Sequence, residues 1–211
     1  MSDAHDELVN VYDAAGAVIG VRPRREAKRS SLALGAVNAL LINRQGEVLL
    51  QRRPTDKENG GRWDKSVGGH VSAGEDFDAT LVREAGEELF DDPASGRVTL
   101  AGSEAEFRAR LDQADLERSV IVRRVALQRN LRDVRHAPDG GQRVVLYHVA
   151  VYTGRTDVPL DAFRPQAAEI AELRYFPPSE VDRLFLESYL APNMGFLWLT
   201  QGQALLSLAA R

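Results

Sequence analysis

Three glutamates, Glu84, Glu87 and Glu88, stand close together in the segment "GGHVSAGEDFDATLVREAGEEL". Apolar residues recur at four-residue spacing along the same segment, at Phe77, Leu81, Ala85 and Leu89. This spacing predicts a helix over 76–89 with one buried face. At about 100° per residue, the three carboxylates lie in one arc along the edge of that face, where they repel one another.

Like charges at this spacing destabilise a helix unless a cation offsets them. Clusters of carboxylate oxygens suit hard divalent cations, and Mg²⁺ prefers a few carboxylates together with water and phosphate oxygens. The three glutamates therefore indicate a divalent-cation site. The alternative is an acidic helix face that only solvent covers.

Strands on both sides of this helix must hold it in place. A hairpin with a turn near Gly16 is predicted at 8–21, and "GAVNALLINRQGEVLLQRR" predicts a second hairpin with the turn "NRQG". Alternating apolar residues predict strands at 142–154 and 170–177, whereas 103–135 is mostly helical in pattern. Mixed strands with separated helices indicate an α/β or α+β domain with helices packed on a sheet.

Composition excludes several classes of protein. The chain has 211 residues, 44% of them hydrophobic, which fits one domain with a sizeable core. It has no cysteine, so disulfides, thiolate metal sites and cysteine nucleophiles are excluded. A net charge of −4 gives no overall attraction to nucleic acid, which is not an expected partner. Without a signal peptide or a membrane span, we expect a cytoplasmic protein with no membrane partner.

The spacing of six residues resembles the Nudix box, G-x5-E-x7-R-E-U-x-E-E-x-G-U, in which U is aliphatic. The matching residues are Gly69, Glu75, Arg83, Glu84, Glu87 and Glu88. The flanking segments "LLQRRP" and "AELRYFPPSE" are also similar to segments of that family. The resemblance implies a single domain over 1–211 with the Nudix-type α/β/α sandwich. It would contain a mixed sheet, the N-terminal β-hairpin at 8–21 and a helical insert at about 103–135.

The last two fixed positions of the box differ, because Phe90 replaces the glycine and Asp91 replaces the aliphatic residue. A glycine there would form a left-handed helix cap, so a different helix exit is predicted, with the acidic site retained. We expect the ring of Phe90 to pack under the 103–135 insert. The expected apolar partners are Phe107, Leu111 and Leu116.

The resemblance implies a role for each box residue. The metal ligands for Mg²⁺ or Mn²⁺ would be Gly69 through its carbonyl, Glu84, Glu87 and Glu88. Arg83 would orient a box carboxylate, the alternative being an ordinary surface arginine. A second interpretation of Glu75 is a role in capping the helix, because Ser72 to Glu75 is also a capping-box pattern. Glu169, on a later loop, is the candidate general base, or else a surface residue before a strand.

The implied reaction is hydrolysis of a diphosphate bond in a nucleoside diphosphate linked to another moiety, by attack of water on phosphorus. The substrate would be a small molecule. Basic residues near the box are candidates for clamping its phosphates, although each could also be solvated: Arg52, Arg53 and Lys65. The hairpin at 8–21 could supply a contact in a homodimer.

Two other functions are compatible with the same fold. Isopentenyl diphosphate isomerase is a Nudix relative that "WDKSVGGHVSAGED" faintly resembles, but that enzyme uses an active-site cysteine, which this chain lacks. A Nudix-like module that binds a nucleotide without hydrolysing it is the second alternative, supported by Phe90 and the 103–135 insert. Mg²⁺-dependent release of products from a panel of nucleoside diphosphate compounds would separate these functions. Loops and inserts set specificity in such a scaffold, so the box alone does not identify the substrate.

Overall fold

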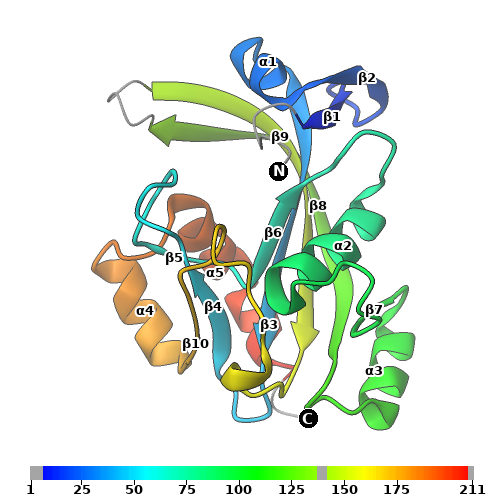
Figure 1. Cartoon of the computed structure of the whole chain (residues 1–211), viewed down its shortest axis with the longest axis vertical. Coiled ribbons are helices and arrows are strands. Elements are labelled where there is room, and N and C mark those ends of the chain that lie inside the picture. Colours follow the sequence, from blue (N-terminus) through cyan, green and yellow to red (C-terminus); the bar gives the residue numbers. More distant parts are fainter. Residues whose placement is uncertain (1–6, 137–141, 209–211) are drawn as a thin grey trace.

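The computed structural model describes residues 7–136 and 142–208, which are built around one mixed sheet of ten strands (Figure 1). The main path of the sheet runs in the order β10-β4-β3-β9-β8-β7. In that order the strands are Glu172–Phe176, Val48–Arg52, Ala33–Ile42, Gln142–Arg155, Val120–His136 and Val98–Ala101. The pairs β3–β9 and β7–β8 are parallel, and the other pairs on this path are antiparallel.

β3 lies at the centre of the sheet and pairs with four other strands. One edge pairs with β9 over residues 33–42. The other edge pairs in turn with β1 (Leu8–Tyr12), β6 (Val67–His70) and β4. Because β6 contains Gly68 and Gly69, this pairing places the start of the box against the middle of the sheet.

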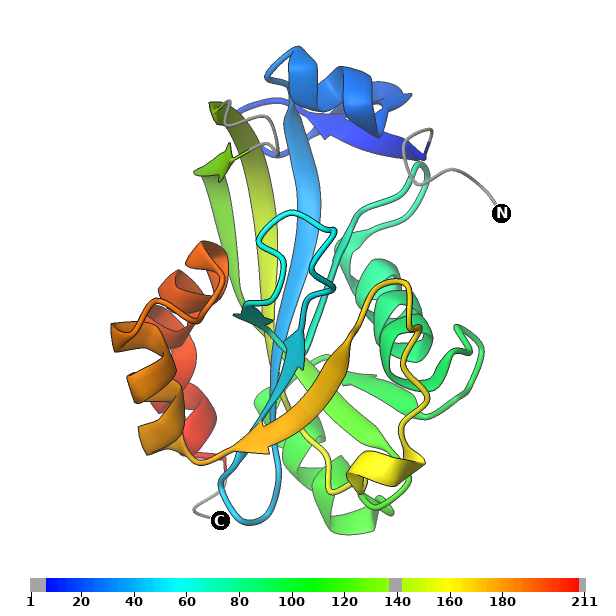
Figure 2. The same cartoon turned by 60° about the vertical axis from the view of Figure 1, so that its left-hand side comes forward.

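Helices cover both faces of the sheet (Figure 2). They are α2 (Phe77–Phe90) on one face and α4 (Pro178–Leu186) and α5 (Pro192–Leu206) on the other. Alternate residues of β3 and β4 serve two apolar cores: Leu41 and Leu49 pack on the α2 side, and Leu40 and Leu50 pack on the α4 and α5 side. The predicted α/β/α sandwich with a mixed sheet is confirmed.

The predicted N-terminal hairpin is confirmed as well. β1 pairs antiparallel with β2 (Val18–Pro23), and Gly16 in the turn has a φ of 91°, a conformation that favours glycine. The remaining short elements are α1 (Arg24–Arg29), β5 (Trp63–Asp64) and η1 (Leu160–Ala162). No helix within the described residues is long and apolar enough to cross a membrane.

The prediction of a helical insert at about 103–135 is wrong over most of that segment. Only α3 (Glu104–Gln113) is helical, and it is capped by Ser103, whose side chain accepts from the Glu106 amide at 3.1 Å. From Val120 onwards the chain forms β8. Residues 120–122 are buried and pair with β7, and residues 121 and 122 also pair with β9. Pairing and burial therefore make this segment a strand, although its charged sequence pattern is typical of a helix.

The helix that carries the box begins and ends close to its predicted bounds of 76–89. Asp76 is its N-cap, with a side chain that accepts from the Ala79 amide at 2.8 Å. Asp91, with φ 53° and ψ 27°, takes the left-handed conformation that ends the helix. Ser72 is therefore not the cap that the Ser72 to Glu75 pattern predicts, because the helix begins at Phe77.

Phe90 is buried, but not under the insert. Its side chain is 7% exposed, and its ring centroid lies 5.7 Å from that of Phe163 and 4.9 Å from the guanidinium of Arg97. The expected partners belong to the other core: Phe107, Leu111 and Leu116. The altered helix exit thus holds an aromatic side chain on the α2 side of the sheet.

Candidate active site

Arg83 is the centre of the box in three dimensions. Its Nε and Nη2 donate to the two oxygens of Glu75 at 2.8 and 3.1 Å. Nη2 also donates to Glu84 at 3.0 Å, and Nη1 donates to Glu87 at 3.0 Å. One planar guanidinium therefore gathers three of the predicted box carboxylates, which lie on α2 and the loop before it.

Glu84 lies directly against the backbone of Gly69. A Cβ added to Gly69 would stand 2.1 Å from the carboxyl carbon of Glu84, so any larger residue would displace the carboxylate. Glu88, one turn further along α2, accepts from the Gly68 amide at 2.9 Å. The Gly68–Gly69 pair of β6 thus holds two of the predicted ligands against the sheet.

The electrostatics of these carboxylates follow from their burial. Burial raises the pKa of Glu84 to about 7, and the charge of Glu87 adds to the rise although Arg83 opposes it. Burial likewise raises the pKa of Glu88, and the charge of Glu84 adds to that rise. Both groups are thus destabilised as carboxylates near neutral pH, and a cation beside them would remove this cost.

The residues fit a divalent cation by their chemistry. Within residues 7–136 and 142–208, no three His, Asp or Glu side chains are grouped closely enough to hold a metal ion as they stand. Arg83 instead supplies the positive charge between Glu75, Glu84 and Glu87. Carboxylate oxygens from one helix, beside an open glycine backbone, form the donor set that Mg²⁺ and Mn²⁺ prefer.

The three basic residues predicted to bind phosphate do not lie together. Arg53 pairs with Asp64 at 3.2 Å, and Asp64 pairs with Lys65 at 3.2 Å. Lys65 is close enough to Glu88 to lower the pKa of that carboxyl, so this group of charges borders the box. Burial would raise the pKa of Asp64, but the charges of Lys65 and Arg53 hold it below its usual value.

Arg52 has a different environment, which corrects its predicted role. Its guanidinium lies 6.0 Å from the ring centre of Trp63 and 3.6 Å from Glu172. Successive side chains of a strand point to opposite faces, and the side chain of Gln51 contacts Glu88. Arg52 therefore points to the face that α4 and α5 cover, away from the box carboxylates.

Glu169 lies on the loop that precedes β10, at a distance along the chain from the box. It pairs with Lys57 at 3.0 Å and is exposed. The start of the same loop is tied to the end of α2, because the Arg164 amide donates to the Leu89 carbonyl at 2.8 Å. No hydrogen bond in the described part of the chain joins Glu169 to a box carboxylate.

Gln51 is a member of the site that the sequence patterns do not indicate. Its amide nitrogen lies 3.5 Å from Glu88, across 37 residues of sequence. The residue is only 4% exposed. A polar residue at a buried position of an apolar strand is the signal that points to it.

Comparison with known proteins agrees with this geometry. The family model described as "NUDIX domain" matches residues 33–194. The chain belongs to the Nudix family. An uncharacterized Nudix hydrolase of Pseudomonas aeruginosa is 30% identical over 164 residues, which cover 69% of this chain and 95% of that protein. This Nudix chain is accordingly a hydrolase that acts on diphosphate bonds.

Solved structures of the Nudix fold resemble the chain over most of its length. DR0079 from Deinococcus radiodurans has a TM-score of 0.60 at 19% identity, over 90% of this chain and 96% of that one. The Nudix domain of Shewanella oneidensis NrtR, solved with ADP ribose, has a TM-score of 0.51 at 16% identity, over 82% and 88%. At these identities the likeness concerns the fold.

One of the similar proteins is an isopentenyl diphosphate isomerase, the enzyme that the segment before the helix resembles. The isopentenyl-diphosphate Delta-isomerase of Paenarthrobacter aurescens is 39% identical over 85 residues, which cover 39% of this Nudix chain and 46% of that enzyme. The matched stretch is therefore under half of the isomerase.

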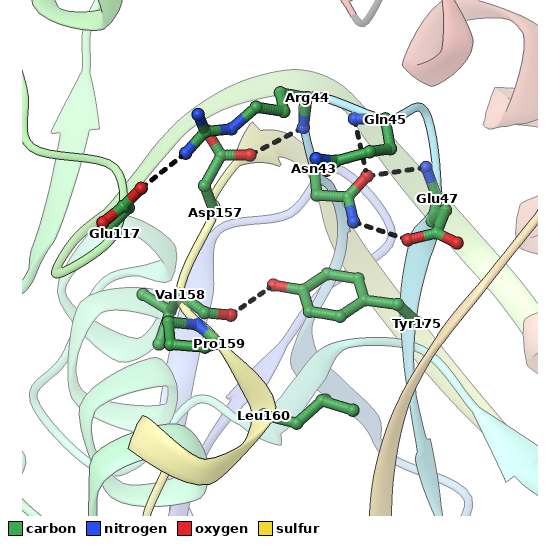
Figure 3. Close-up of a pocket in the computed structure, with 10 residues that line it drawn as sticks. All are labelled: Asn43, Arg44, Gln45, Glu47, Glu117, Asp157, Val158, Pro159, Leu160 and Tyr175. Carbon is green, nitrogen blue, oxygen red and sulfur yellow. Dashed lines mark hydrogen bonds and ion pairs between the residues drawn. The ribbon is translucent and has the colours of Figure 1, made fainter.

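A pocket of about 470 Å³ lies beside the β3–β4 turn of the Nudix fold (Figure 3). Arg44 in this pocket pairs with Glu117 at 2.8 Å and with Asp157 at 3.3 Å. The Tyr175 hydroxyl donates to the Val158 carbonyl at 2.9 Å. These charged and phenolic groups thus have hydrogen-bond or ion-pair partners within the pocket lining, and none of the box residues lines the pocket. It is therefore separate from the candidate active site.

Proposed function

We propose that this Nudix hydrolase cleaves a diphosphate bond in a nucleoside diphosphate linked to another moiety, and that it requires Mg²⁺ or Mn²⁺. The observation that carries the proposal is the group of box carboxylates on one face of α2: Glu84 and Glu87 contact Arg83, and Glu88 lies one turn beyond Glu84 against the Gly68 amide, with the pKa of Glu84 and of Glu88 raised. Glu84 and Glu88 stay unfavourable as carboxylates even with Arg83 present, and a metal cation would remove that cost. A bound cation would neutralise phosphate charge and acidify the attacking water.

Each residue of the site has a proposed task. Glu84, Glu87 and Glu88 would turn their oxygens toward the cation, helped by the carbonyl of Gly69. Arg83 would hold Glu84 and Glu87 in place, while Glu75 orients Arg83. These tasks would explain why α2, which packs one face against the apolar core, carries so many acidic residues.

Phosphate binding and proton transfer use residues around the box. We assign phosphate binding to Lys65 and Arg53, because Lys65 lies close to Glu88 and Arg53 shares the partner Asp64 with Lys65. Glu169 is the candidate general base, since its loop is tied to the end of α2 and its side chain is exposed. Release of Glu169 from Lys57 would free its carboxylate to accept a proton from water.

The test is a substrate panel with Mg²⁺ and with Mn²⁺, read by product masses. The panel contains nucleotide sugars, dinucleotides, nucleoside triphosphates and coenzyme-like diphosphates. It includes ADP-ribose, the compound named with the Shewanella structure, and isopentenyl diphosphate as a probe for isomerase activity. Product masses show which phosphorus was attacked when the reaction is run in ¹⁸O water.

If the protein binds one of these compounds but hydrolyses none of them, the result would instead support a module that binds a nucleotide without cleaving it.

The cytoplasmic location and the homodimer stay predictions. Size-exclusion chromatography with light scattering measures the oligomeric state directly.

A further inference from the structure

β1 pairs with the loop that leads into the catalytic helix, as well as with the sheet (Figure 1). The Asn10 amide donates to the Val71 carbonyl at 3.3 Å, and the Ala73 amide donates to the Leu8 carbonyl at 2.9 Å. A β-bridge joins Val9 to Ser72 between these two bonds. The N-terminal hairpin is therefore bonded to residues 71–73 of the box by main-chain hydrogen bonds.

The Asn10 side chain completes this attachment. It is 3% exposed, and its Nδ2 donates to the Glu75 carbonyl at 2.9 Å. Its Oδ1 accepts from the Gly74 amide at 3.2 Å. Gly74 has a φ of 82°, so the turn takes a left-handed step at the residue that the amide holds. The buried Asn10 amide thus pairs with both the Gly74 N–H and the Glu75 carbonyl of the turn. Leaving such main-chain groups without a hydrogen bond would destabilise the fold.

A second connection runs from the hairpin to Arg83. Glu7 accepts from the Ser72 hydroxyl at 2.8 Å and pairs with Arg24 at 2.7 Å. The same Ser72 oxygen accepts from Nη2 of Arg83 at 3.4 Å. The N-terminal segment therefore reaches the guanidinium through one intervening hydroxyl, independently of Asn10.

We propose that Asn10 is a positioning residue for the metal site of this enzyme. By holding the Glu75 main chain, Asn10 fixes the carboxylate that binds Arg83 at two points, and Arg83 in turn places Glu84 and Glu87. The inference rests on the proposed metal-dependent function. Asn10 lies outside residues 33–194, so the site depends on an element that the family domain does not include.

Asn43 offers a matched control. It is 6% exposed, and its side chain also closes a turn, accepting from the amides of Gln45 at 3.0 Å and Glu47 at 2.8 Å. That turn joins β3 to β4 beside the pocket of Figure 3, away from the box. Replacing Asn43 therefore removes a buried turn-closing amide without touching the catalytic helix.

The experiment compares Asn10→Ala with Asn43→Ala in the full chain. Mn²⁺ binding to the metal-free enzyme is measured by the electron paramagnetic resonance signal of free Mn²⁺. Turnover of the panel's best compound is measured against Mg²⁺ concentration. We expect Asn10→Ala to raise the Mn²⁺ dissociation constant and the half-saturating Mg²⁺ concentration about tenfold or more. Asn43→Ala should leave both values within about twofold of wild type, while both variants lower the melting temperature.

The outcomes separate the inference from the proposed function. Unchanged Mn²⁺ binding and Mg²⁺ dependence in Asn10→Ala would overturn the positioning role, and so would equal weakening in Asn43→Ala. If Asn10→Ala does not fold, Asn10→Ser replaces it, because its short hydroxyl cannot reach both main-chain groups. A wild-type protein that binds no Mn²⁺ and cleaves no compound would overturn the proposed function, and this inference with it.

Discussion

Arg83 binds Glu75 at two points, with Nε to Oε1 at 2.8 Å and Nη2 to Oε2 at 3.1 Å. Burial alone would raise the pKa of Glu75, but the hydrogen bonds from Arg83 and Thr80 hold it below its usual value. Glu75 therefore stays ionised, and it anchors the guanidinium while the other nitrogens reach Glu84 and Glu87. The fork of an arginine, which presents several donors in one plane, is what this arrangement requires.

Arg83→Lys should lower kcat about tenfold or more at saturating Mg²⁺ with little change in KM, because an ammonium cannot span the three carboxylates at once. Steady-state kinetics measure both values. The control is Arg108→Lys, whose residue forms an exposed pair with Glu104 on α3. An Arg83→Lys enzyme with the kcat of wild type would show that charge alone suffices.

Glu87→Gln and Glu88→Gln should each reduce turnover by orders of magnitude, because each removes a charge from the proposed metal site. The fold should remain intact, and the metal-free Glu88→Gln protein should melt at the wild-type temperature or above, since burial disfavours the carboxylate. Circular dichroism and turnover at saturating Mg²⁺ measure these effects. Glu180→Gln, on the exposed side of α4, is the control. Near wild-type rates in a variant would remove that residue from the ligand set.

Mg²⁺ should stabilise the folded protein, because a site that exists only in the native state adds binding free energy to folding. The gain is about 2.7 kcal/mol at a Mg²⁺ concentration of one hundred dissociation constants. Differential scanning fluorimetry across a Mg²⁺ series measures the rise in melting temperature. NaCl at matched ionic strength tests general screening, and an equal rise with NaCl would argue against a specific site.

The metal-free protein should lose stability as the pH rises from about 4.5 to about 7. The folded state raises the pKa of Glu84 from 4.5 to about 7, so over this range the native state binds more protons than the unfolded state. The free energy of unfolding should fall by up to about 3 kcal/mol. Urea titrations at several pH values measure the slope. Glu84→Gln should reduce the slope and leave the part that Glu88 contributes, because burial raises the pKa of Glu88 as well. An unchanged slope in Glu84→Gln would assign the effect to another group.

Phe90→Gly should lower the free energy of unfolding by about 3 kcal/mol or more, because the ring is buried against Phe163 and Arg97. Asp91→Gly is the matched change at the next position. It should stabilise the protein by about 1 kcal/mol, because Asp91 holds the left-handed conformation that glycine adopts freely. Urea denaturation measures both variants. If the urea midpoint of Phe90→Gly equals that of wild type, Phe90 in place of the box glycine has no effect on stability.

Much of the candidate active site can be predicted from the sequence alone. The apolar stripe of α2 and the spacing of Glu84, Glu87 and Glu88 both depend on the geometry of one helix, which 3.6 residues per turn makes predictable. The hairpins were predictable for a similar reason, because their turns need glycine at positive φ, as at Gly16 and Gly46. Local rules apply wherever one element contains the whole pattern.

The tertiary structure decided whatever depends on contacts across the chain. Residues 120–136 form a strand because β7 and β9 pair with them, against a charged pattern that predicts a helix. Arg52 and Arg53 are neighbours in sequence, yet the alternation of a strand sends only Arg53 toward Asp64 and the box. Asn10 reaches Glu75 across 65 residues. Such contacts follow from the packing of whole elements, which local propensity does not encode.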